Sequence, residues 1–353
     1  MSKVLLLFIG KVFCQIGDDS LSFHITYSVE VFQSLEKWNK TLTLLTVISE
    51  DIYTAGNNAI FHLSKDLNIK SLHLTNEEEN IYKILAVSES LERLVTCSSG
   101  RARGCQLRNL NDVNKTYPSA NVKFHANIVA SGKFKTIGLI APGILKDSSL
   151  YVARSIDLTG KDEGSCPLFE RSLAESGHND RETNTMSERV KSSFVIYYSD
   201  GFSYKGFVYF LASQREDAST TDSYVVPKLS RICQRARGEK FESFTELKIT
   251  CRGGSGNLYS ITQSAHLIGE DLFIVLNKYG DDPTQFDPQP QSALCIYNME
   301  VINTAFQASI QACACEPPGS DLNSNNNYLG RARCGLFSKL VCKAYDLHSI
   351  CSL

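Results

Sequence analysis

Residues 194–202 read FVIYYSDGF and residues 206–214 read GFVYFLASQ. Each stretch is rich in aromatic and β-branched residues, which favour strands, and polar residues with a glycine separate the two stretches. Two half-buried strands joined by a short polar turn fit this pattern. The sequence therefore predicts a β-hairpin just past the middle of the chain.

Runs of the same kind recur along the chain between turn residues. They cover 51–56, 59–64, 91–97, 134–141, 150–154, 224–233, 244–251, 258–267, 272–277 and 293–297. Many short strands with frequent turns are typical of a sandwich, a barrel or a propeller. Polar stretches at 157–191, 280–291 and 317–327 are expected to be long loops.

One segment carries a helical rather than a strand period. Apolar residues repeat at spacings of three and four over residues 298–312, from Val301 and Ile302 through Phe306 to Ile310. We therefore expect an all-β domain with one helical insertion after the strand at 293–297.

Composition excludes some classes of partner. Charged residues make up 21% of the 353 residues and the net charge is -2, so no overall field would hold nucleic acid or an anionic membrane. No stretch approaches the roughly 18 uninterrupted apolar residues that a membrane helix needs. We expect recognition to be local, with no nucleic acid bound and no direct membrane insertion by this chain.

Cysteine usage points to an oxidising compartment. Twelve cysteines are too many for a typical reduced cytosolic protein of this length. Sequons at Asn39 and Asn114 are compatible with secretion and predict glycosylation. Residues 1–17 have a basic start and a short apolar run that Lys11 interrupts, which indicates a signal peptide. The alternative is that this segment is a first strand that packs on the domain.

The sequence carries no recognisable catalytic or metal-binding pattern. The seven histidines lie far apart, and the cysteines near residue 313 contain no Cys-x-x-Cys pair for zinc. The glycine-rich stretch 252–256 lacks the lysine of a phosphate-binding loop and the spacing of a nucleophile elbow. We therefore expect no catalytic residue, no metal and no cofactor, and the chain is not predicted to be an enzyme.

Several segments, in order, resemble the sema domain of plexins. They are 51–67, 94–110, 194–214, 227–251, 292–295 and the helical stretch 298–312 with Cys313. The resemblance covers roughly residues 42–316 and implies a seven-bladed β-propeller with a helical extrusion in its fifth blade. Seven blades of about 40 to 50 residues each would need more chain than is present, and the matched segments stop at that extrusion, so we expect about five of the seven blades. We expect a partial sema domain over residues 18–353, with the extrusion at 297–341.

The resemblance also implies disulfide pairs. Carried over position by position, it pairs Cys97 with Cys105, Cys251 with Cys295, and Cys313 with Cys334. Cys233 would pair with a cysteine just beyond the extrusion, and either Cys342 or Cys351 could serve.

In function, the resemblance implies an extracellular module of a semaphorin receptor at the cell surface, with a semaphorin as its protein ligand. It would be anchored in the membrane only in a longer form of the chain. A truncated or secreted sema-domain protein, of the semaphorin or scatter-factor-receptor type, stays open as an alternative that acts as a decoy or lacks a stable function. A hydrolytic propeller would need a carboxylate pair or a metal in a central cleft, and no such pair is visible at the strand ends.

Overall fold

Antiparallel strands that pair with their neighbours in sequence build most of the described part of this chain. The computed structural model describes residues 6–17, 20–31, 42–75, 80–100, 104–117, 128–130, 134–142, 148–156, 167–173, 181–184, 195–216, 223–234, 243–254, 256–278 and 291–315.

Five sheets follow an amino-terminal hairpin, and each sheet is made of consecutive strands. The first contains β3 (Leu42–Ile48), β4 (Asp51–Gly56), β5 (Ala59–Ser64) and β6 (Ile69–Leu74). The second contains β7 (Tyr82–Ser88), β8 (Arg93–Ser98) and β9 (Cys105–Asn109). The third contains β10 (Thr136–Pro142), β11 (Ser148–Arg154), β12 (Leu168–Ser172) and β13 (Arg181–Asn184).

The last two sheets complete the series. The fourth contains β14 (Ile196–Tyr204), β15 (Phe207–Arg215), β16 (Val225–Cys233) and β17 (Thr245–Lys248). The fifth contains β18 (Cys251–Arg252), β19 (Leu258–Ile268), β20 (Asp271–Lys278) and β21 (Ser292–Asn298), and the helix α2 (Met299–Cys315) follows β21 directly.

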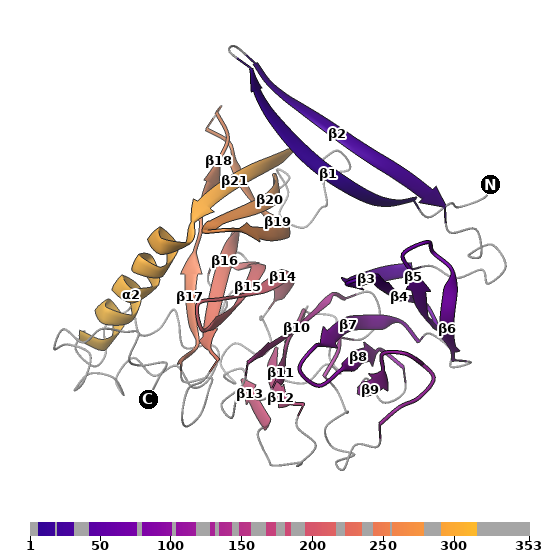
Figure 1. Ribbon diagram of the computed structural model, residues 1–353. Coiled ribbons are helices and arrows are strands. Elements are labelled where there is room, and N and C mark those ends of the chain that lie inside the picture. The colour runs from indigo at the N-terminus through magenta and orange to yellow at the C-terminus, as the bar shows by residue number, and fades with distance from the viewer. Residues whose placement is uncertain are drawn as a thin grey trace.

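Successive sheets lie side by side around an arc (Figure 1). β7 contacts β3 and β4, β10 contacts β7, β14 contacts β10, and β19 contacts β14, so each sheet touches the next. This is the arrangement of propeller blades, and it confirms the prediction of an all-β propeller with five blades.

The hydrophobic core lies between neighbouring blades rather than at one centre. Tyr151 of the third blade packs in one buried cluster with Tyr198 and Phe210 of the fourth. Leu211 of the fourth blade packs with Leu272 and Ile274 of the fifth in another. Because each of these two clusters joins two blades, removal of one of these blades would expose apolar surface on its neighbour.

The hairpin predicted from residues 194–214 forms β14 and β15. Its turn is Lys205-Gly206, and both residues have positive φ, 43° and 85°. Positive φ at both central residues is the geometry of the two-residue turn that matches the right-handed twist of paired strands. The register also shifts between Tyr198 and Asp200, a bulge that redirects the Asp200 side chain.

The structure corrects two expectations about loops and strands. Within the stretch 157–191, expected to be a loop, it places β12 and β13. The polar residues Glu170 and Arg171 of β12 are themselves buried, so polarity misled the prediction. The strand expected at 244–251 is divided between β17 and β18, which belong to different blades.

The amino-terminal hairpin pairs β1 (Leu6–Gly17) with β2 (Ser20–Val31), and Leu6 lies opposite Val31. β1 falls within residues 1–17, for which the sequence predicts a cleavable leader, and cleavage there stays a prediction. The helix α2 closely matches the helical stretch expected at 298–312 and contacts β17 as well as β21. In the part of the chain that the structure describes, no helix combines the length and apolar character needed to cross a membrane.

Candidate binding site beside the inserted helix

The helix α2 begins at a well-defined cap. The Asn298 side-chain oxygen accepts hydrogen bonds from the backbone N–H groups of Glu300 at 3.0 Å and Val301 at 3.4 Å. An asparagine in this position satisfies donors that the first helical turn leaves without partners. The helix then buries Ile302 and Phe306 in the core cluster shared by the fourth and fifth blades. Its first turns are thereby fixed against the outer part of the fourth blade.

Arg231 of β16 lies beneath this helix and is 4% exposed. Its guanidinium carbon is 4.5 Å from the ring centroid of Phe207 and 4.5 Å from that of Phe306. Two aromatic rings thus stabilise the buried cation. Burial lowers the pKa of Arg231 below its usual value, and a hydrogen bond with Tyr209 opposes this shift. Among the described residues, no carboxylate lies within ion-pair distance of it.

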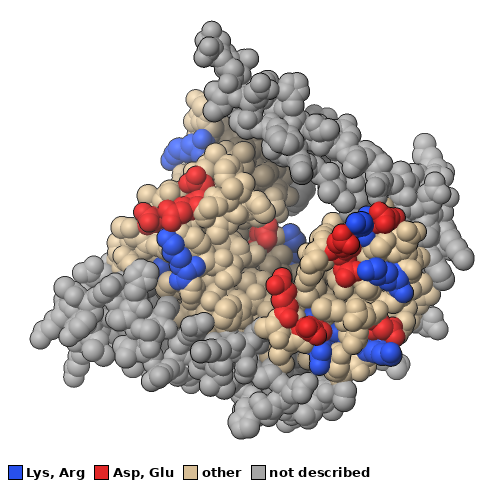
Figure 2. All heavy atoms as spheres, in the orientation of Figure 1, with Lys and Arg blue, Asp and Glu red and all other residues tan. Residues whose placement is uncertain are grey.

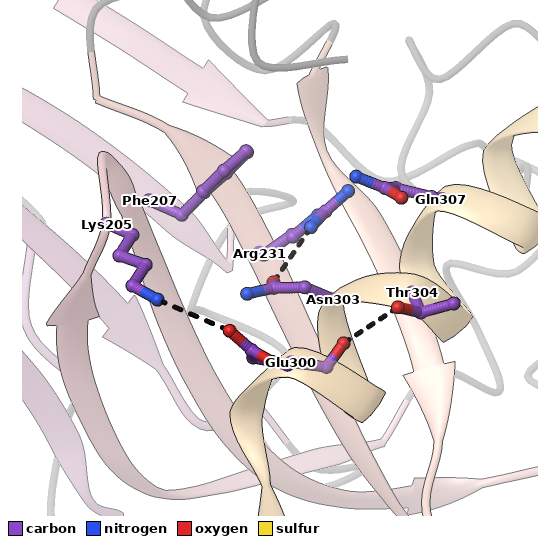
Figure 3. Close-up of a pocket in the computed structure, with 7 residues that line it drawn as sticks. All are labelled: Lys205, Phe207, Arg231, Glu300, Asn303, Thr304 and Gln307. Carbon is purple, nitrogen blue, oxygen red and sulfur yellow. Dashed lines mark hydrogen bonds and ion pairs between the residues drawn. The ribbon is translucent and has the colours of Figure 1, made fainter. Parts of the chain in front are cut away.

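Asn303 connects the helix to this arginine. Its Oδ1 atom accepts hydrogen bonds from the Tyr209 hydroxyl at 2.6 Å and from Arg231 at 3.1 Å. Because the oxygen is held by two donors, the orientation of the amide is fixed. Figure 3 shows the amide nitrogen of Asn303 on the side of Lys205, away from Arg231.

Lys205, in the β14–β15 turn, supplies a second cation. Its Nζ atom lies 2.9 Å from Glu270 and 4.0 Å from Glu300. Hydrogen bonds with Tyr204 and Glu270 raise the pKa of Lys205, so it stays charged under physiological conditions.

These side chains surround a cleft of about 250 Å³. Its lining comes from the β14–β15 hairpin, β16 and one side of α2 (Figure 3), namely Lys205, Phe207, Arg231, Glu300, Asn303, Thr304 and Gln307. The cleft combines an apolar wall with several hydrogen-bond donors, which suits a small polar group.

Elsewhere on the face shown in Figure 2, positive and negative side chains are interspersed. Among the described residues on that face, no large area carries charges of one sign alone. Within the described ranges, no three side chains of the metal-binding types converge.

Two of the cysteine pairs implied by the family resemblance are bonded in the structure. Cys97 and Cys105 lie opposite each other on β8 and β9, and Cys251 joins Cys295 of β21. Cys233 is also disulfide-bonded. Its proposed partners Cys342 and Cys351, and the Cys334 expected to pair with Cys313, lie outside the described residues.

Of the two glycosylation sequons, the structure describes the one at Asn114. Asn114 is exposed, and its Nδ2 atom donates a hydrogen bond to the Leu72 carbonyl at 2.7 Å. An amide with one remaining hydrogen could keep this bond after a glycan is attached. Asn39 lies outside the described residues. Glycosylation at both positions stays a prediction.

Sequence reasoning assigned no role to Lys205, Arg231 or Asn303. Arg231 lies inside the matched segment 227–251, but nothing in the sequence indicates that it meets a helix 72 residues away. One weak feature marks Arg231 as unusual: it is a charged residue in β16, a strand whose other positions are largely buried.

The sequence of this chain resembles those of known proteins. No family model matches the chain. Plexin-A3 of Mus musculus is 25% identical over 339 residues, which cover 80% of this chain and 18% of the mouse protein. This chain therefore spans less than a fifth of the length of that relative.

Solved structures show the same fold. The plexin A4 extracellular region superposes with a TM-score of 0.67 at 22% identity, over 83% of this chain and 37% of that one. A chain from the solved complex of Drosophila Plexin A with Semaphorin 1b gives a TM-score of 0.51 at 14% identity, over 77% of this chain and 53% of that one. Together with the five blades, the matched cysteine pairs and the sequence relative, these likenesses show a β-propeller of the sema type that resembles the plexin extracellular region.

Proposed function

We propose that this chain is the ligand-binding part of a plexin-like receptor and that its ligand is a semaphorin. The single observation that carries the proposal is the arc of five sema-type blades, which matches plexin ectodomains in sequence and in fold. One of the similar solved structures is a complex of Drosophila Plexin A with Semaphorin 1b.

The architecture suits recognition of a protein surface. Buried clusters join each blade to the next, so the described strands of neighbouring blades are held in fixed relative positions. A preorganised surface loses less conformational entropy on binding than a mobile one. The disulfides between Cys97 and Cys105 and between Cys251 and Cys295 are compatible with an extracellular position.

Direct binding tests this proposal. The 353-residue chain, secreted from eukaryotic cells, would be titrated over immobilised semaphorin ectodomains from one organism. We expect saturable binding to at least one semaphorin. The matched control is the same chain after reduction and alkylation of its disulfides, which should lose that binding. Absence of binding to every semaphorin by a chain with intact disulfides and native strand content would contradict the proposal.

A further inference from the structure

We propose that the cleft between the β14–β15 turn and α2 binds a single carboxylate group, supplied by an acidic side chain of a peptide segment. This proposal does not rest on semaphorin binding, because it is argued from the residues that line the cleft.

The first argument is the charge of Arg231. It is buried, it lies 4.5 Å from the ring centroids of Phe207 and Phe306, and its side-chain hydrogen bonds among the described residues go to neutral groups, the Asn303 amide and the Tyr209 hydroxyl. A buried cation without an anionic partner among the described residues is electrostatically costly. A carboxylate that enters the cleft would complete an ion pair, and guanidinium and carboxylate groups match each other in geometry.

The second argument is the convergence of donors. Tyr209 and Arg231 occupy the Asn303 oxygen, so its Nδ2 hydrogens are left for the opposite side. Figure 3 shows that nitrogen on the side of Lys205. A carboxylate has two oxygens with about four acceptor sites, and it can accept from the ammonium, the amide and the guanidinium together.

The third argument limits the ligand to one charge. Glu270 and Glu300 lie close to Lys205, at 2.9 Å and 4.0 Å, and would repel the further charges of a sulfated glycan. Next to the donors, Phe207 lines the cleft and Val301 is 69% exposed on the first turn of α2. An acidic residue beside apolar residues in a peptide fits this combination better than a polyanion.

Glu300 competes with the ligand in this arrangement. Its carboxylate lines the same cleft and is the nearest acceptor to Lys205 within it. Because its side chain is largely exposed, it can rotate into solvent when another carboxylate arrives. Neutralising Glu300 should therefore strengthen binding.

The test is an NMR titration of the full chain with N-acetylglutamate α-amide, a probe with one carboxylate. The neutral N-acetylglutamine α-amide is the matched ligand control. We expect saturable shifts of the Arg231 and Asn303 side-chain signals with a dissociation constant on the order of 1–10 mM, and no shift with the neutral analogue. Saturation by both compounds, or by neither, would overturn the proposal.

Variants sharpen the result. Asn303→Asp keeps an acceptor for Tyr209 and Arg231 but places a negative charge in the cleft, so affinity should fall by about tenfold or more. Ala308→Asp adds the same charge at an exposed position of the same helix that does not line the cleft, and it should change affinity by less than about twofold. If Asn303→Asp does not fold, Glu300→Gln still decides the question, since it should raise affinity by roughly threefold. Unchanged affinity in the variant that folds would contradict the site.

Two further ligands distinguish the source of the carboxylate. Free L-glutamate carries an additional ammonium and a second carboxylate, and a heparin disaccharide carries several sulfates. We expect both to bind more weakly than the peptide-like probe. Tighter binding of free glutamate would point to a metabolite instead of a peptide, and tighter binding of the heparin fragment to a glycan; either result overturns the assignment.

Discussion

Asp200 and Ala265 join the fourth blade to the fifth: the Asp200 Oδ2 atom accepts a hydrogen bond of 2.8 Å from the Ala265 backbone N–H. The other carboxylate oxygen accepts from the Gly201 N–H, also at 2.8 Å. The bulge in β14 makes this possible because it changes the register at Asp200. The carboxylate thereby holds a strand of the next blade in place.

Replacing Asp200 tests that contact. Asp200→Ala leaves the Ala265 N–H without its side-chain acceptor and should lower the free energy of unfolding by about 1–3 kcal/mol. The conservative Asp200→Asn retains one acceptor oxygen and should cost less. Denaturant unfolding of both variants measures the difference. Equal stability of Asp200→Ala and the unsubstituted chain would show that the contact contributes nothing.

The two disulfides should differ in how much they stabilise the chain. Cys251–Cys295 spans 44 residues and Cys97–Cys105 spans 8. A longer loop restricts the unfolded chain more, so paired Cys→Ser changes should cost about 4 kcal/mol for the first bond and about 2.5 kcal/mol for the second. Unfolding of the two double variants measures this order, and non-reducing peptide mapping verifies that the remaining pairs are intact. The reverse order would contradict the loop-length explanation.

Phe306 should be the residue that attaches α2 to the fourth blade. It is fully buried, stacks on Arg231 and meets the Tyr209 ring edge to face at 6.1 Å. Phe306→Ala should reduce stability by roughly 3–5 kcal/mol, because it leaves a cavity and uncovers a buried cation. The control Val301→Ala, at an exposed position of the same helix, should stay within about 0.5 kcal/mol of the unsubstituted chain. Thermal unfolding compares the two, and similar losses would argue against this role.

Glu246 should give the protein a distinct pH dependence. Its side chain is 6% exposed and lies 3.7 Å from the Lys228 ammonium. Burial raises the pKa of Glu246 above 4.5. The folded state therefore holds this proton more tightly than the unfolded state, so the contribution of Glu246 to stability falls as pH rises from about 4.5 through the raised pKa. Glu246→Gln cannot titrate.

The measurement is the difference in unfolding free energy between Glu246→Gln and the unsubstituted chain at several pH values. We expect this difference to shift in favour of the glutamine variant as pH rises from 4.5, and to level off above the raised pKa. A difference that shifts toward the unsubstituted chain over the same range would show that the ion pair with Lys228 outweighs burial.

Asn114 should carry a glycan when the chain is secreted. Thr116→Ala removes the sequon but leaves the Asn114 hydrogen bond to Leu72, whereas Asn114→Gln disturbs both. We expect both variants to lose the mass of the glycan. Only Asn114→Gln should also have a lower free energy of unfolding, by about 1 kcal/mol. Mass spectrometry before and after glycosidase treatment checks the first point. An unmodified Asn114 peptide in secreted protein would refute the prediction.

Local patterns in the sequence were enough to find the strands that alternate or carry strong β-forming residues. The predicted strands at 51–56 and 59–64 coincide with β4 and β5. The helix expected at 298–312 coincides closely with α2. Periodicity is a property of neighbouring residues, so it can be recognised in the sequence without knowledge of the fold. The propeller class and the two described cysteine pairs came from family resemblance instead.

Contacts between distant segments were invisible to that reasoning. β12 was missed because Glu170 and Arg171 are polar yet buried, and burial of such residues depends on partners contributed by the rest of the fold. The division of 244–251 into β17 and β18 was missed because both pieces have strand-forming residues, and only pairing with different blades separates them.

The cleft beside α2 depends wholly on contacts between segments that are distant in sequence. Its cations lie in a turn and in a strand, at Lys205 and Arg231, and its amide lies in a helix, at Asn303. In the unfolded chain these residues are far apart, and nothing in their local sequence distinguishes them from ordinary surface residues. The packing of α2 on the fourth blade brings them together, since burial of Phe306 fixes the helix and so sets the distance from Asn303 to Arg231. Residue types and periodicity thus determine the elements of this protein, whereas the position of one packed helix creates its candidate binding site.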